Sequence, residues 1–164
     1  STSVDILQVL RLISFSLIKL GMFDDALLYS TRGLDFQSDD MMLLHLSAYA
    51  LDLAGKHESA IDHYKKILEI DPDNASAKNS LAYIIAKTGG DLTKAHRLVK
   101  EALQSSPENP AYLDTFGFIL YKMDNLKSAK QYLEKALSKD PTSKDIIYHL
   151  AMVKKAFEDN LQKR

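Results

Sequence analysis

Hydrophobic residues recur at separations of three and four along most of the chain, as in Leu10, Ile13 and Leu17. This spacing places apolar side chains on one face of an α-helix and leaves the opposite face polar. Short polar stretches interrupt the pattern about every seventeen residues, a length typical of one helix and its connection. The pattern therefore predicts an all-α chain built from a series of amphipathic helices.

The helices come in pairs that repeat along the chain. Ala26, Ala60, Ala95 and Ala129 follow one another at separations of 34, 35 and 34 residues. A leucine lies eight residues after each alanine, and Pro72, Pro107 and Pro141 close three of the repeats. Self-similarity at such a period indicates stacked units that bury their apolar faces only against a neighbour. The repeats span residues 7–40, 41–74, 75–109 and 110–143, followed by a single helix over 144–164.

Polar and small residues mark where each helix of a repeat begins and ends. Gly21, Gly55 and Gly89 lie between the two helices of their repeats, where glycine adopts the left-handed conformation that ends a helix. The fourth repeat has Asp124 and Asn125 there, and both residue types tolerate this turn. Asp40, Asn74, Asn109 and Ser143 close the repeats, and each is expected to cap the helix that follows.

The repeat resembles the tetratricopeptide repeat. Repeat position 8 carries Ser14, Ala48, Ala82, Gly117 and Ala151, position 20 the four alanines, and position 32 the three prolines. The large residue usual at position 4 is replaced by Lys78 in the third repeat, and the first repeat has Gly33 where alanine is expected. The resemblance implies a right-handed α-solenoid of stacked antiparallel helix pairs, a single domain over 1–164 with a capping helix over 144–164.

The first helix, from about Val4 to Leu20, carries apolar residues on more than one face. This predicts that another element packs on its far side, so we expect the chain to be the C-terminal part of a longer array. Asp5, Arg11 and Lys19 interrupt it, so we expect no membrane insertion.

The amino-acid composition argues against several classes of function. The 46% hydrophobic content supports a core, and a net charge of −1 gives no electrostatic case for nucleic acid. There is no cysteine, and His57 and His63 lie too far apart along the chain to hold a metal on one helical face. We expect neither a metal, nor a cofactor, nor enzymatic activity, because no nucleophile, base and stabilising group can be assembled from these residues.

The resemblance implies that positions 2, 5, 9, 12 and 13 of each first helix line a concave groove that binds a protein or peptide partner. Position 9 is an aromatic residue in all four repeats, and such side chains dominate binding hot spots. The predicted groove residues are Arg11, Phe15, Lys19, His45, Tyr49, Asp52, Asn79, Tyr83, Lys87, Asp114, Phe118, Tyr121, Lys122 and Tyr148. The same aromatic stripe is equally consistent with packing between first helices, and Tyr49 and Tyr83 are the members favoured for exposure because they carry hydroxyls.

The leading interpretation is therefore a non-catalytic interaction scaffold. Two alternatives stay open: a self-assembly element that forms homo-oligomers, and a regulatory segment of a larger enzyme. The run from Asn79 to Asp124 resembles bacterial cell-envelope repeat proteins that act as assembly or adaptor factors. Both the cytoplasm and the bacterial envelope remain open as the compartment.

The repeat register makes a stability prediction. Positions 8 and 20 lie where the paired helices cross closely, so Ala60→Leu or Ala129→Leu should lower the free energy of unfolding by about 1–3 kcal/mol through overpacking. Thermal melts of the two variants check this. An unchanged melting temperature in both would contradict the register itself.

Overall fold

The computed structural model describes residues 2–162, and every regular element within that range is an α-helix. The helices are α1 (Thr2–Lys19), α2 (Phe23–Phe36), α3 (Met41–Leu53), α4 (His57–Ile70), α5 (Ala75–Lys87), α6 (Leu92–Ser105), α7 (Pro110–Lys122), α8 (Leu126–Lys139) and α9 (Lys144–Gln162). Packing joins α1 to α2, α3 to α4 and α7 to α8, the pairs expected for their repeats, and an ion pair between Lys78 and Glu101 joins α5 to α6. Helix α9 begins a fifth repeat position as a single helix.

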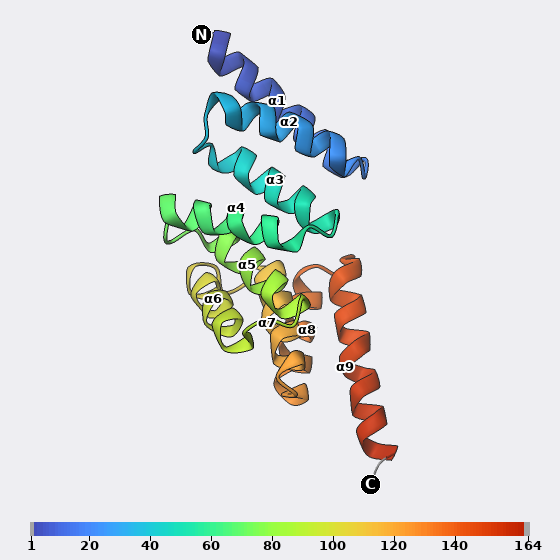
Figure 1. Ribbon diagram of the computed structural model, residues 1–164. Coiled ribbons are helices and arrows are strands. Elements are labelled where there is room, and N and C mark those ends of the chain that lie inside the picture. Colours follow the sequence, from blue (N-terminus) through green and yellow to red (C-terminus); the bar gives the residue numbers. More distant parts are fainter. Residues whose placement is uncertain (1, 163–164) are drawn as a thin grey trace. The chain divides into compact units, whose positions relative to one another are not determined.

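The chain divides into two compact bodies, Ser1–Ala77 and Lys78–Arg164. In the N-terminal body, each of α2, α3 and α4 packs against the helix before it, so the helices lie side by side in chain order (Figure 1). Within the C-terminal body, α7 packs against α6 and α8, and α9 packs against both α8 and α7. Consecutive antiparallel helices thus build each body, as the sequence predicts.

The turns within repeats have the backbone conformation expected from their residues. Gly21, Gly55 and Gly89 have φ of +75°, +77° and +77°, and Asp124 takes the equivalent place with φ of +60°. The left-handed conformation lets the chain reverse within two or three residues, so the second helix of the repeat can return along the first. All four turns predicted from sequence are confirmed.

The predicted caps between repeats are also confirmed. Asp40 accepts a hydrogen bond from the Leu43 amide at 2.9 Å, and Asn109 accepts one from the Ala111 amide at 2.9 Å. Asn74 and Ser143 make the corresponding bonds at the starts of α5 and α9. Each cap satisfies an amide that has no partner within its own helix, and so fixes where the first helix of the next repeat begins.

The paired helices of each repeat approach closely at the small residues. The alanines at position 20 are fully buried, as are Ser14, Ala48 and Ala82 at position 8. A Cβ added to Gly117 would lie 2.6 Å from Leu133 Cγ, so no side chain fits there. Ala151 occupies the same position in α9 and is exposed, because no second helix packs on that face within the described residues.

Two departures from the repeat pattern have local explanations. Lys78, which replaces a large apolar residue, keeps a mostly buried side chain and extends its ammonium group to Glu101 on α6 at 2.9 Å. Gly33, which replaces alanine, receives the side chain of Leu43 from α3 directly against its backbone. Both substitutions preserve packing between helices by a different pair of groups.

The turn geometry gives a matched pair of variants. Gly55→Ala should lower the free energy of unfolding by about 1 kcal/mol, because an L-residue is strained at φ of +77° while an added Cβ meets nothing within 4 Å. Asp124→Gly should cause no such loss, because glycine adopts φ of +60° without strain. Urea denaturation of both variants measures the difference. Equal destabilisation by the two substitutions would contradict this account of the turns.

Candidate protein-binding site

The aromatic residues of position 9 are exposed in the N-terminal body. Phe15 on α1 and Tyr49 on α3 each leave 50% of their surface in solvent. Their helices are in direct contact, because α3 packs against α1 as well as against α2. Two large rings at the same repeat position therefore lie on neighbouring first helices and are accessible to a ligand.

In the C-terminal body, the aromatic residues at position 9 are less exposed. Phe118 on α7 is buried, because the imidazole of His149 on α9 stacks on its ring with centroids 4.6 Å apart. Tyr83 on α5 is half-buried, with its ring 5.5 Å from Phe118 and 6.0 Å from His149. These aromatics therefore pack against one another and against the last helix, as the packing interpretation of the stripe requires.

Asp114 belongs to this buried cluster and is not exposed as a groove residue would be. Both of its carboxylate oxygens lie within 3.0 Å of Nδ1 of His149, and both side chains are largely removed from solvent. A buried carboxylate needs such a partner, since an unpaired charge in the interior is costly. The pair fixes α9 on α7, which is a structural role.

The lysines at position 13 lie over the aromatic rings of position 9. The ammonium groups of Lys19, Lys87 and Lys122 are 5.4, 5.8 and 5.6 Å from the ring centroids of the aromatic residues four positions earlier. One helical turn brings residues four apart onto the same face, so each cation contacts the ring beside it. In α3 the lysine is replaced by Leu53, which leaves Tyr49 flanked by an apolar residue.

Arg11, at position 5 of the first repeat, connects two helices of the N-terminal body. Arg11 on α1 forms an ion pair with Asp40, the residue that caps α3. Burial alone would raise the pKa of Asp40, but the hydrogen bonds from Arg11 and from the Leu43 amide outweigh it, and the net pKa is lowered. The guanidinium predicted for the groove is thus partly engaged in joining α1 to α3.

His45 on α3 is half-buried at the same position. Its Nε2 lies 3.4 Å from Oδ1 of Asn74, and its ring meets that of Tyr64 edge-on with centroids 5.6 Å apart. Burial lowers the pKa of His45, and the contact with Asn74 offsets this only in part. The imidazole is therefore held mainly as a neutral group between α3 and α4.

The remaining predicted groove residues differ in exposure. Asp52 is buried and lies 2.8 Å from Nδ1 of His57, so it joins α3 to α4. Asn79 is half-buried and its Oδ1 has no hydrogen-bond partner among the described residues. Tyr121 is half-buried, whereas Lys19, Lys87, Lys122 and Tyr148 are exposed.

The sequence prediction missed two exposed residues at repeat positions that it assigned to the groove. Met42 and Leu53 occupy positions 2 and 13 of α3, with 59% and 42% of their surface exposed. Their repeat positions are among those that the resemblance assigns to the groove, and this signal could have identified them. Because both are apolar residues of a leucine-rich helix, however, the sequence favoured their burial. With Phe15 and Tyr49 they form what we call the N-terminal aromatic face.

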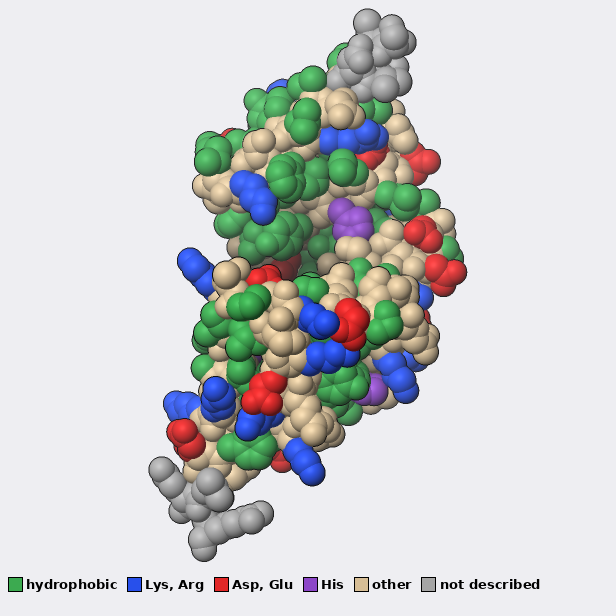
Figure 2. Space-filling model, turned by 180° about the vertical axis from the view of Figure 1, so that it is seen from behind, with side chains coloured by type: hydrophobic (Ala, Val, Ile, Leu, Met, Phe, Trp, Pro, Cys, Tyr) green, Lys and Arg blue, Asp and Glu red, His purple; other side chains and the backbone are tan. Residues whose placement is uncertain are grey.

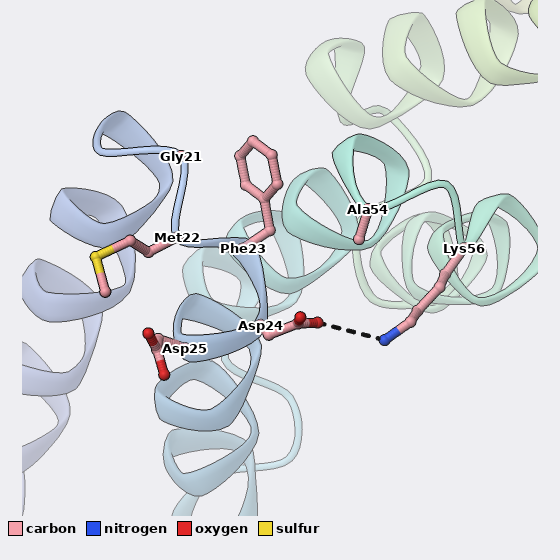
Figure 3. A pocket seen from close by; sticks show the side chains of 7 residues that line it. All are labelled: Gly21, Met22, Phe23, Asp24, Asp25, Ala54 and Lys56. Atoms are coloured by element: carbon pink, nitrogen blue, oxygen red, sulfur yellow. Dashed lines mark ion pairs between the residues drawn. The ribbon is translucent and has the colours of Figure 1, made fainter.

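A separate hollow of about 490 Å³ lies at the turns of the N-terminal body (Figure 3). The turn between α1 and α2, with Met22 and Phe23, forms one side, and Ala54 and Lys56 after α3 form the other. Lys56 reaches Asp24 at 3.6 Å, an ion pair between exposed side chains that contributes little to stability. The carboxylates of Asp24 and Asp25 also line the hollow.

Metal-binding and membrane-spanning features are absent from the described part of the chain. No group of three or more histidine, aspartate or glutamate side chains in residues 2–162 is placed to hold a metal ion. No helix among the same residues is long and apolar enough to cross a membrane.

The half-buried imidazole of His45 predicts a pH dependence of stability. The unfolded chain protonates His45 near its ordinary pKa of about 6.5, whereas the folded chain resists protonation, so its contribution to stability is complete above that pH and is lost as pH falls through the lower folded pKa. Between about pH 7.5 and about pH 5.5, wild type should therefore lose more stability than His45→Gln. Urea midpoints across this range measure both slopes, and identical slopes would contradict the assignment.

Known proteins contain the same repeat. Two family models described as tetratricopeptide repeat match residues 53–115 and 111–143. The TPR repeat-containing protein PA4667 of Pseudomonas aeruginosa is 29% identical over 110 residues, which are 67% of this chain and 19% of that protein. This chain thus spans about a fifth of the length of that relative.

Solved structures share the fold. The thermophilic TPR protein TTC0263 of Thermus thermophilus superposes with a TM-score of 0.82 at 19% identity, over 92% of this chain and 82% of that one. PilF of Pseudomonas aeruginosa superposes with a TM-score of 0.79 at 16% identity, over 98% of this chain and 73% of that one. The matched family models, the helix pairs and their caps agree, and this chain belongs to the tetratricopeptide repeat family.

Proposed function

We propose that this chain is a non-catalytic scaffold that binds a segment of a partner protein on the N-terminal aromatic face. Tetratricopeptide repeats are protein-interaction modules, and the matched models cover much of this chain. The observation that carries the proposal is the equal exposure of Phe15 and Tyr49 at one repeat position on adjacent helices. Their counterparts in the C-terminal body support only packing.

The chemistry of this face indicates the kind of segment it would bind. Phe15, Met42, Tyr49 and Leu53 all expose a large share of their apolar surface. Figure 2 shows hydrophobic side chains gathered over the N-terminal body, with a few basic groups among them. Rigid aromatic side chains are favoured at binding hot spots because they bury large areas at low entropic cost, and the flexible methionine side chain adapts to the shape of a partner.

Electrostatics adds a preference at one end of the face. Lys19 is exposed and lies over the Phe15 ring, and Arg11 beside it already has a carboxylate partner in Asp40. A carboxylate of the partner would meet Lys19 next to the ring, where an ion pair and apolar contact form together. We therefore propose an apolar segment with an acidic group at the end that reaches Lys19.

The test compares two pairs of exposed hydrophobic residues. Phe15→Ala with Tyr49→Ala removes the two aromatic rings of the N-terminal aromatic face, and Leu28→Ala with Phe36→Ala removes two side chains of comparable fractional exposure from α2. The tagged variants and wild type are used to capture partners from a lysate of the source organism, and the captured partner is then purified and titrated by calorimetry. The first pair should raise its Kd at least tenfold, as expected when hot-spot side chains are truncated, and the second pair should leave it within about twofold.

Circular dichroism first confirms that both double variants are folded. A Kd raised by the α2 pair and not by the aromatic pair would move binding to the second helices. A Kd unchanged in both would move it away from the N-terminal body and leave Phe15 and Tyr49 without a binding role.

A further inference from the structure

The outer face of α1 exposes apolar residues on a side that the groove does not use. Ile6, Val9 and Leu12 leave 45%, 52% and 58% of their surface in solvent, and Ser16 continues the same face. No charged side chain occurs at these four places. Val9, Leu12 and Ser16 hold repeat positions 3, 6 and 10, which are distinct from the groove positions that carry Phe15 and Lys19.

These positions are covered in later first helices of the same chain. Position 3 is Leu43 in α3 and Ile146 in α9, with 0% and 3% exposed. Position 10 is Ala50 in α3 and Val153 in α9, and both are fully buried. Position 6 is Leu46 in α3, which is half-buried and packs against the buried cluster of Ile18, Ala26 and Ala50. Because the sequence register is the same, the exposure of Val9 and Leu12 reflects a missing neighbour and not a different kind of residue.

The neighbour that covers these positions elsewhere is the second helix of the preceding repeat. Leu43 packs on the backbone of Gly33 in α2, and Ile146 clusters with Ala136 of α8. A small residue of the second helix thus receives a large residue of the next first helix at both interfaces. Val9 is the large residue of the same kind of contact, without its small partner among the described residues.

We propose that the outer face of α1 packs against the second helix of a further tetratricopeptide repeat that precedes α1 in the same polypeptide. The contact continues the α2–α3 interface by one repeat, with a glycine or alanine of the incoming helix opposite Val9. A second copy of this chain is a poorer fit, because its α2, α6 and α8 already pack against α3, α7 and α9. Its α4 carries the buried Ile67 at the repeat position where α2 and α8 carry Gly33 and Ala136. The proposal concerns a different face from the N-terminal aromatic face and does not depend on it.

A single introduced thiol tests the proposal, since this chain contains no cysteine. Leu12→Cys places the thiol on the outer face, and Leu28→Cys places a control thiol on an exposed position of α2. Each substitution is made in the gene of the source organism and separately in the 164-residue chain alone. Maleimide labelling of the folded proteins is followed by peptide mass spectrometry, which assigns the rate to the introduced cysteine.

A reference for a covered face comes from the chain itself. A copy of residues 110–143 placed directly before Leu7 puts α8 ahead of α1 in the register it has ahead of α9. In this extended chain Leu12→Cys should label at least tenfold more slowly than Leu28→Cys. In the 164-residue chain alone, the two thiols should label at similar rates.

The natural gene product decides the matter. Slow labelling of Leu12→Cys there, with fast labelling of Leu28→Cys, is the expected result. Similar rates for both thiols in the natural product would overturn the proposal, because the face would then lie in solvent. Slow labelling in the 164-residue chain that becomes fast on dilution would also overturn it, because a second copy would then be the occupant.

Discussion

The close crossing of the two helices within each repeat is the contact on which the remaining structure depends. Fully buried alanines at position 20 face fully buried small residues at position 8, and at Gly117 even a methyl group would collide with Leu133. Helix backbones that approach so closely leave their larger side chains to pack above and below the crossing. The repeat therefore becomes a flat pair of helices with apolar surface on both sides, which must be buried against neighbouring helices.

The turns and caps convert that pair into a repeating arrangement. Left-handed residues reverse the chain within a repeat, and a capping side chain such as Asp40 or Asn109 begins the next first helix. In the N-terminal body, the first helices α1 and α3 therefore pack against each other, and each carries an exposed aromatic residue at position 9. This regularity places Phe15 beside Tyr49 without any contact between the two rings being required, and it also leaves the outer face of α1 ready for one more second helix.

The aromatic residues at position 9 lie in different surroundings in the two bodies. In the C-terminal body, His149 pairs with Asp114 and stacks on Phe118, so the aromatic stripe becomes part of the interior. In the N-terminal body, the residue equivalent to His149 on the first helix that follows Phe15 is Leu46 of α3, and Phe15 stays exposed, as does Tyr49. An aromatic residue at position 9 is thus compatible with either burial or exposure, and its neighbours decide which.

The sequence alone determined the helix pairs, the four turns, the four caps and the family, because each depends on local chemistry repeated at a fixed period. The sequence did not reveal that Phe118 is buried whereas Phe15 is exposed, or that Arg11 is paired with a carboxylate. Burial and pairing depend on residues 29 to 35 positions away, such as Asp40 and His149. The exposure of Met42 and Leu53 could not be predicted for the same reason. An apolar residue is buried only when a neighbouring helix covers the side of the helix on which it lies. Tertiary structure decided which side chains meet solvent, because that is a property of the stacked helices and not of any one repeat.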